Sequence, residues 1–181
     1  AEWDDIVTIS KIADEAGIEF ILPVAKWRGF GGDSDLWGRS FEVLTHSAAI
    51  GALTKQIGIF ATVHVPLVSP AFAAKAMVTI DHVTHGRAGL NIVCGWNQEE
   101  FDLHGITIDP EQRYEQGLEW FEIYSRLLAG GPRFDWDGQF YKLKGLSTDP
   151  LPIQRPGPVV MSAGFSTKGR DFAAKSVDIL F

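Results

Sequence analysis

Five short runs of apolar residues, rich in β-branched side chains, alternate with helical stretches along this 181-residue chain, and this order constrains the fold most. The runs are uniformly apolar rather than alternating with polar residues, which is typical of strands buried on both faces of a parallel sheet. Short connections between strands and helices favour the same architecture. We therefore expect parallel strands, adjacent in sequence order, near residues 18–24, 57–63, 88–94, 157–162 and 177–181.

Periodic stretches with helix-start residues fill the intervals between these strands. They predict helices over residues 3–16, 38–56, 69–84, 110–129 and 166–176. Ser69 and Ser166 precede two of them and are expected to act as N-caps. Residues 134–143 favour a hairpin.

One helix, four strand–helix units and a final strand together predict an α/β fold of the (β/α)₈ TIM-barrel type. We expect one domain over residues 1–181 with a hairpin excursion near 131–150. A full barrel needs about 250 residues. We therefore expect the first strand and the C-terminal βα units to lie outside this sequence.

Composition excludes several function classes. The net charge of −7 comes without a basic stripe, which argues against a nucleic-acid or anionic-membrane partner. No apolar run reaches the roughly 18 residues of a membrane span. The single cysteine, Cys94, excludes a disulfide framework, and no histidine spacing predicts a metal site. These features fit a cytoplasmic protein.

Barrel enzymes carry their active sites at the carboxyl ends of the strands, and two polar residues there interrupt apolar strands. Thr62 and Asn91 need hydrogen-bond partners if they are buried. A bound ligand would supply these partners. Thr62 is also a common β-strand residue, and Asn91 is also typical of a strand-end hydrogen bonder.

A second candidate site lies at the start of the helix after Ser166. The free N–H groups of a helix start favour an anion such as phosphate. Arg113 and Tyr114, at the start of the long helix, could add contacts to the same anion. The simpler alternatives are a plain N-cap at Ser166 and a solvated charge at Arg113. The glycine-rich GFGGD lacks the GxGxxG spacing of a dinucleotide fingerprint, so it predicts a loop.

Six segments together resemble the bacterial luciferase-like FMN-dependent monooxygenases, and they span the whole chain in the same order. They are AKWRGFGG, FATV, HVTHGRAGLNIVCGWNQEEFDLHG, EQRYEQGLEWFEI, FDWDGQFYKL and MSAGFS. The similarity is greatest to the branch of pyrimidine, dimethylsulfone and alkanesulfonate monooxygenases. Val24 stands where the pyrimidine enzymes have methionine, and the loop between Glu100 and Arg113 is shorter, so the substrate stays open.

The resemblance implies a site at the barrel mouth. The residues that match the family's FMN contacts are Ala25, Lys26, Asn91, Glu100, Arg113, Tyr114 and Ser166. Thr62 and Asn91 match the residues that line the oxygen pocket in the branch that activates oxygen at flavin N5, which makes them the catalytic candidates. Trp96 and His64 are the candidates for the substrate pocket.

The resemblance also implies an activity. Reduced FMN and O₂ would oxygenate a small organic molecule, and a separate NAD(P)H-dependent flavin reductase would supply the flavin. The protein would form a homo-oligomer, dimer or tetramer. Three alternatives share the fold: an F420-dependent hydride-transfer enzyme, a non-catalytic flavin-binding protein, and a barrel for an unrelated phosphate-containing substrate.

Overall fold

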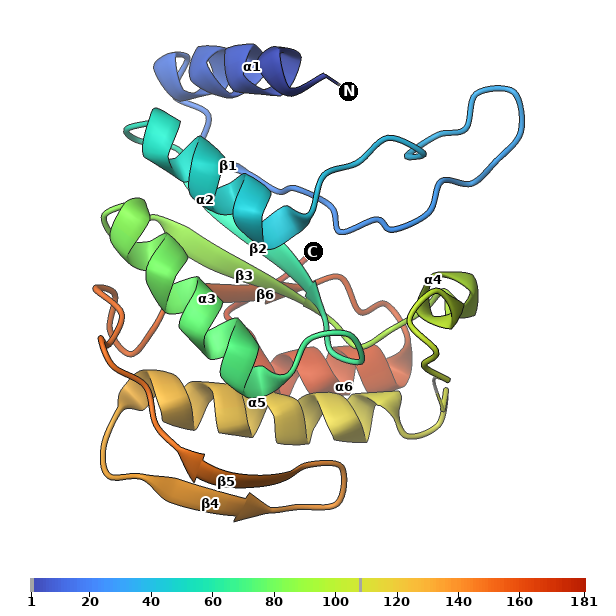
Figure 1. Ribbon diagram of the computed structural model, residues 1–181, viewed down its shortest axis with the longest axis vertical. Helices are drawn as coiled ribbons and strands as arrows, with labels where there is room; N and C mark the ends of the chain where they lie inside the picture. The colour runs from blue at the N-terminus through green and yellow to red at the C-terminus, as the bar shows by residue number, and fades with distance from the viewer. Residues whose placement is uncertain (1, 108) are drawn as a thin grey trace.

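A five-stranded parallel sheet organises the computed structural model, which describes residues 2–107 and 109–181 (Figure 1). Its strands, in spatial order, are β1 (Phe20–Ile21), β2 (Gly58–His64), β3 (Ala88–Val93), β6 (Val159–Ser162) and β7 (Ile179–Leu180). The predicted strands, their parallel direction and their order are confirmed. The first strand is shorter than residues 18–24, and Pro23, which has no N–H to donate, follows it closely.

Helices cover the sheet and largely match the prediction. They are α1 (Trp3–Glu15), α2 (Val43–Leu53), α3 (Pro70–Val83), α5 (Arg113–Ala129) and α6 (Thr167–Ser176). Ser69 and Ser166 are N-caps as expected, because their side chains accept from backbone N–H groups of the first turn. The expected start of α2 at residue 38 is wrong, since Glu42 caps the helix by accepting from the N–H groups of Leu44 and Thr45.

Two further features lie between β3 and β6. The short helix α4 (Gln98–Asp102) was not predicted. The expected hairpin is formed by β4 (Phe134–Asp137) and β5 (Lys142–Leu146), which pair antiparallel beside α5 (Figure 1). Glu119 of α5 holds the hairpin, because its carboxylate accepts from the Trp136 indole N–H and from three backbone N–H groups, those of Gln139, Phe140 and Tyr141.

The main hydrophobic core lies between the sheet and its helices. One set of alternating strand residues packs there against α3, α5 and α6, namely Ala61, Val63, Leu90, Ile92 and Val160. The opposite set points to the other face of the sheet because side chains alternate along a strand. That face carries Phe60, Thr62, His64, Asn91 and Met161. Both polar residues expected at the barrel mouth, Thr62 and Asn91, are therefore on the face away from the helices.

Buried charges hold the amino end of the sheet together. Asp14 of α1 accepts from the N–H groups of residues 55–57 just before β2. Burial raises the pKa of Asp14, but these donors and Arg87 outweigh it and hold the pKa below its ordinary value. Arg87 donates to the carbonyl groups of Gly51, Thr54 and Ile57.

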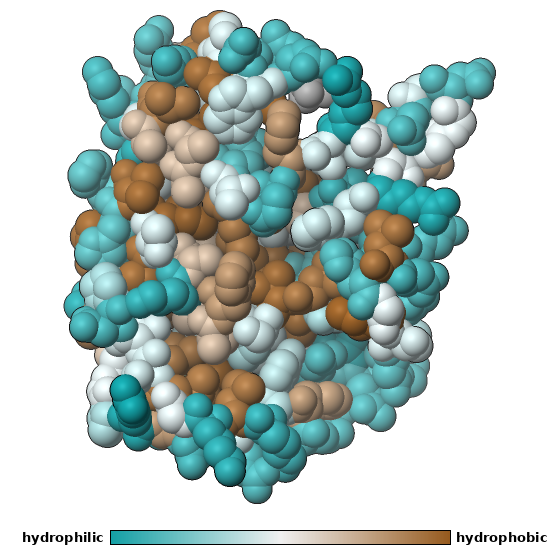
Figure 2. Space-filling view, in the orientation of Figure 1, coloured by the Kyte–Doolittle hydropathy of each residue, from teal (hydrophilic) through white to brown (hydrophobic). Residues whose placement is uncertain are grey.

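The outer surface is uneven in polarity. Hydrophobic residues gather over α2 and α3, while the rim of the molecule is mostly hydrophilic (Figure 2). No helix within residues 2–107 and 109–181 is both long and apolar enough to cross a membrane.

Candidate functional site

The carboxyl ends of β2 and β3 bring two predicted catalytic residues into contact. Thr62 and Asn91 are register partners, and the Asn91 Nδ2 donates to Thr62 Oγ1 over 3.1 Å. Thr62 Oγ1 in turn donates to the Pro23 carbonyl over 2.8 Å. Asn91 Oδ1 is buried and has no hydrogen-bond partner among the described residues. Backbone contact therefore satisfies Thr62, whereas Asn91 keeps an acceptor for a ligand.

A buried ion pair adjoins them. Lys26 Nζ lies 2.6 Å from Glu100 Oε1, and both side chains are nearly inaccessible. The same oxygen accepts from the N–H groups of Trp27 and Arg28. Glu100 Oε2 is without a partner in the part of the chain that the structure describes. The ammonium group also lies 4.4 Å from the ring centre of Phe30.

His64 lies beneath this pair at the end of β2. Only 4% of the residue is exposed, and its ring packs edge-on against Phe101 of α4. Burial lowers its pKa to about 4; Lys26 acts in the same direction and Glu100 opposes. His64 is therefore neutral at physiological pH, and its Nδ1 has no partner within the described residues.

Of the three residues proposed for an anion, Tyr114 and Ser166 meet between α5 and α6, and Arg113 binds the segment after β3. Ser166 Oγ donates to the Tyr114 hydroxyl over 3.2 Å and accepts from the Gly169 N–H. Arg113 donates from Nη1 to the Gly95 carbonyl over 3.0 Å, and its buried Nε finds no partner among the residues described. A cavity of about 220 Å³ at this point is lined by Ile92, Val93, Cys94, Gly95, Trp96, Arg113, Tyr114, Ser162, Ala163 and Gly164.

Cys94 borders the same cavity but is not suited to nucleophilic chemistry. Burial raises the pKa of its thiol to about 12, although Arg113 acts in the opposite direction. A thiol of that pKa is protonated at neutral pH. Cys94 is therefore a buried side chain that packs as a small apolar residue.

Four atoms define what this end of the sheet offers a ligand. We call them the unpaired site atoms: His64 Nδ1, Asn91 Oδ1, Glu100 Oε2 and Arg113 Nε. A buried polar atom without a partner is costly, so such a group of atoms is typical of a binding site. They offer a donor to an anion and acceptors to a ligand with N–H or O–H groups. Among the residues described, no group of three or more His, Cys, Asp and Glu side chains is arranged to hold a metal ion.

Sequence reasoning missed three contributors. Phe30 contacts the Lys26 ammonium, Phe101 covers His64, and the Gly95 carbonyl holds Arg113. The Gly95 carbonyl is a backbone group and leaves no signal in the sequence. Of the predicted residues, Trp96 and Ser166 are exposed and the others lie buried or half-buried around this end of the sheet.

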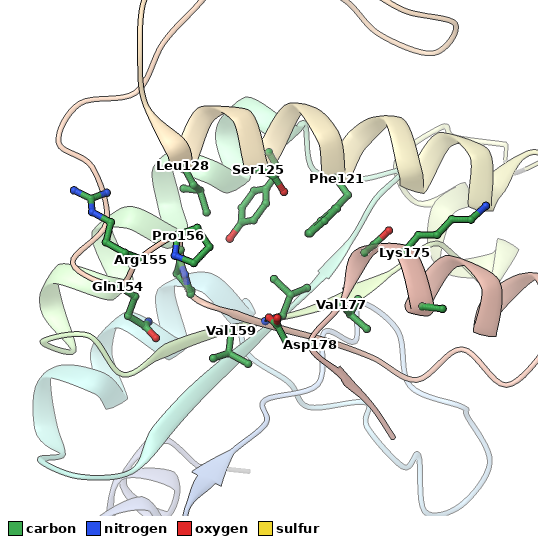
Figure 3. Close-up of a pocket in the computed structure, with 16 residues that line it drawn as sticks. Phe121, Ser125, Leu128, Gln154, Arg155, Pro156, Val159, Lys175, Val177 and Asp178 are labelled. Carbon is green, nitrogen blue, oxygen red and sulfur yellow. The ribbon is translucent and has the colours of Figure 1, made fainter.

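A larger cavity lies elsewhere. It measures about 610 Å³ and sits at the amino ends of β6 and β7, lined by residues of α5 and α6. Phe121 and Leu128 point from α5 into it, while the charged ends of Arg155 and Lys175 point away from its centre (Figure 3). No predicted site residue lines it. The polar chemistry is therefore at the opposite end of the strands.

Comparison with known proteins identifies a family that this chain matches. The family model described as luciferase-like monooxygenase matches residues 1–181. The pyrimidine monooxygenase RutA of Methylorubrum extorquens is 33% identical over 172 residues, which are 93% of this chain and 46% of that protein. The chain thus spans about half the length of the relatives it matches.

Solved structures show the same fold. Riboflavin lyase, in a complex with modified FMN and riboflavin, gives a TM-score of 0.88 at 22% identity, over 98% of this chain and 46% of that one. An F420-dependent secondary alcohol dehydrogenase gives a TM-score of 0.87 at 18% identity, over 98% of this chain and 53% of that one. The fold is therefore common to proteins that bind different cofactors.

Proposed function

Because this chain belongs to the luciferase-like monooxygenase family, we propose that it builds the flavin site of a monooxygenase that uses reduced FMN and O₂ to oxygenate a small organic substrate. The observation that carries the proposal is the group of unpaired site atoms at the carboxyl ends of the strands. Barrel enzymes place their chemistry at this end.

The proposal assigns a role to each part of the site. Arg113 and the first turn of α6 after Ser166 bind the FMN phosphate, since an arginine and free N–H groups both favour a phosphate. Asn91 and Glu100 accept hydrogen bonds from the flavin ring, with Ala25, Lys26 and Tyr114 as further contacts. Bound reduced FMN supplies the electrons that activate oxygen.

Thr62, His64 and Trp96 complete the site. Thr62 holds the Asn91 amide in place through the hydrogen bond between their side chains. Neutral His64 lines the substrate pocket without bringing a charge, and the half-exposed ring of Trp96 walls its mouth. Together with the aromatic ring of Phe30, these side chains exclude water from the reacting atoms.

The wider proposal covers the whole protein. It has a single (β/α)₈ barrel domain, works in the cytoplasm as a dimer or tetramer, and receives reduced flavin from a separate NAD(P)H-dependent reductase. The basis is the family membership and the parallel sheet with helices on one face.

Comparison of FMN with riboflavin tests the phosphate site. We expect FMN to bind at least about tenfold more tightly, because only FMN carries the phosphate that Arg113 and α6 receive. Arg113→Gln should remove this preference, while Arg133→Gln, at an exposed arginine before the hairpin, should preserve it. Flavin fluorescence quenching measures both affinities. Equal binding of FMN and riboflavin by the unmodified protein would contradict the phosphate assignment.

An F420-dependent hydride transfer is the second candidate, favoured by the fold shared with the F420-dependent alcohol dehydrogenase. Titration with FMN, reduced FMN and F420, followed by measurement of oxygen consumption, separates the two. The monooxygenase requires oxygen. The F420 enzyme would turn over without it.

A further inference from the structure

A long segment without helix or strand joins β1 to α2. It runs over residues 22–42 and projects from the body of the molecule on the same side as α4 (Figure 1). In the space-filling view its outer part stands clear of the surface (Figure 2). Loops of this length inside a compact fold are usually functional.

The base of this segment is fixed to the candidate site. Glu100 binds Lys26 and accepts from the N–H groups of Trp27 and Arg28. The Trp27 ring packs edge-on against His104, with centroids 4.8 Å apart. The base therefore moves little relative to α4.

Beyond the base, residues 29–38 form a closed loop with a narrow neck. The backbones of Gly29 and Gly38 approach so closely that a Cβ on Gly29 would lie 2.6 Å from the Gly38 Cα. Within the loop, Phe30 N–H donates to the Leu36 carbonyl and Gly31 N–H donates to the Asp35 carboxylate. We call this unit the Ω-loop, because its ends meet and these hydrogen bonds join residues of the loop to one another.

The side of the Ω-loop that leads back to the neck is apolar and strained. Leu36 is 58% exposed and Trp37 is 45% exposed. Trp37 also has φ of 67°, in the left-handed region that a bulky side chain rarely adopts. Exposed apolar area and backbone strain both favour a second position of the loop in which these two side chains are covered.

We propose that the Ω-loop is a lid, which turns about the Gly29–Gly38 neck and lays Leu36 and Trp37 over a flavin bound at the carboxyl ends of the strands. This inference rests on the proposed function. The site mouth is within reach of these side chains, since the Leu36 carbonyl accepts from the Phe30 N–H and the Phe30 ring lies 6.5 Å from that of Trp96, centroid to centroid. Closure would exclude water from the reaction.

Limited trypsin digestion tests the lid directly. Arg39 follows the neck, and 75% of its side chain is exposed. With saturating FMN, we expect cleavage after Arg39 to slow by at least about fivefold, because the closed loop is held down. Cleavage after Arg133, an exposed arginine before the hairpin, is the internal control and should not change.

A double serine variant separates lid closure from simple stabilisation. Leu36→Ser combined with Trp37→Ser removes the two apolar side chains and leaves the glycines of the neck and the residues of the base unchanged. In this variant FMN should no longer protect Arg39, and FMN should dissociate about tenfold faster. Ile12→Ser, at a comparably exposed residue of α1, should behave like the unmodified protein.

The outcomes distinguish the lid from the proposed function. If FMN fluorescence is quenched on binding but trypsin cleavage after Arg39 is not slowed, the lid is overturned and the flavin site stands. Equal protection at Arg39 and Arg133, or protection that persists in the double serine variant, overturns the lid as well. If FMN does not bind at all, the proposed function fails and the lid fails with it.

Discussion

At the amino end of the sheet, both carboxylate oxygens of Asp81 accept hydrogen bonds, whereas at the carboxyl end only one carboxylate oxygen of Glu100 does. Asp81 accepts from the N–H groups of Ile153 and Gln154 and from the Gln154 side-chain amide. Glu100 Oε1 has three donors, and Oε2 has none among the described residues. Both side chains are almost fully buried, so the difference lies in what surrounds them.

The contrast extends to the neighbouring charges. Asp14 and Arg87 at the amino end hold backbone groups of the end of α2 and of the loop before β2. Arg113 at the carboxyl end holds one carbonyl and leaves its Nε unpaired within the described chain. Charged groups at the amino end thus fix the fold, and those at the carboxyl end retain capacity for a ligand. The contrast is limited to charged groups. Two neutral groups near the amino end, the Tyr124 and Ser176 hydroxyls, are also unpaired among the residues described.

Removing the Asp81 carboxylate should have the largest effect on stability. Asp81→Ala removes the buried carboxylate that accepts from three donors and should lower the free energy of unfolding by about 3–5 kcal/mol. Asp171→Ala, at an exposed aspartate of α6, should change it by less than about 0.5 kcal/mol. Urea unfolding measures both. If Asp81→Ala lowers the free energy of unfolding no more than Asp171→Ala does, the charged group of Asp81 at the amino end does not serve stability.

Acid should reveal the second-largest effect, at His64. The pKa of His64 in the folded protein is about 4, below the ordinary 6.5. Between these two pH values, His64 is neutral in the folded protein and protonated in the unfolded chain. The stability that this provides is present above pH 6.5 and is lost as pH falls through 4. Between pH 7 and 4 the loss should reach about 3 kcal/mol.

His64→Gln isolates this term because glutamine does not titrate. The difference in unfolding free energy between the unmodified protein and the variant should narrow as the pH is lowered. Parallel stability curves for the two proteins would show that His64 is not held neutral by the fold.

The strands were predictable because their burial leaves a continuous apolar pattern in the sequence. The five strands and their order follow from that pattern and from the short connections. The helix α4 was not predictable, since its sequence QEEFD is too short to show a helical period. The start of α2 was misplaced because a glutamate acts there as N-cap, a position where serine, threonine, aspartate and asparagine are the usual signals.

The site was predictable in its polar residues and not in its contacts. Thr62 and Asn91 stand out as polar residues in apolar strands, and Ser166 stands out as a helix start. The ion pair between Lys26 and Glu100 joins residues far apart in the sequence, so only the fold brings them together. The strained Ω-loop likewise has no sequence signal beyond its glycines, because the positive φ of Trp37 is a property of the folded loop.

A smaller effect on stability, and a larger one on binding, should follow from Asn91→Ala. The side chain has one hydrogen bond to Thr62 and one unpaired oxygen, so its loss should change the unfolding free energy by no more than about 1 kcal/mol. FMN affinity should fall about tenfold, because the proposed acceptor for the flavin is removed. Urea unfolding and fluorescence titration give the two numbers. Unchanged FMN affinity would contradict the role of Asn91 at the site.

Thr62→Val should have the smallest effect on FMN binding. It tests whether Thr62 acts by positioning Asn91 and not by contacting the flavin. Valine keeps the shape of threonine, but it removes the acceptor of Asn91 Nδ2 and the donor to the Pro23 carbonyl. Stability should therefore fall by about 1 kcal/mol. FMN affinity should change less than about twofold, because both hydrogen bonds of the hydroxyl are made within the protein. The fraction of consumed oxygen that appears in product should fall, since Thr62 no longer fixes the amide beside the reacting atoms.

The double variant with Asn91→Ala decides how Thr62 acts. If Thr62 works by holding the Asn91 amide, Thr62→Val should lower the free energy of unfolding less in the Asn91→Ala variant than in the unmodified protein. The interaction free energy should be about 0.5–1 kcal/mol. In the Asn91→Ala variant, Thr62→Val should also cause no further fall in the fraction of consumed oxygen that appears in product. Additive losses in both measurements would mean that Thr62 acts independently of Asn91. The hydroxyl would then contact oxygen or substrate itself, which would require it to give up its bond to Pro23 when the ligand binds.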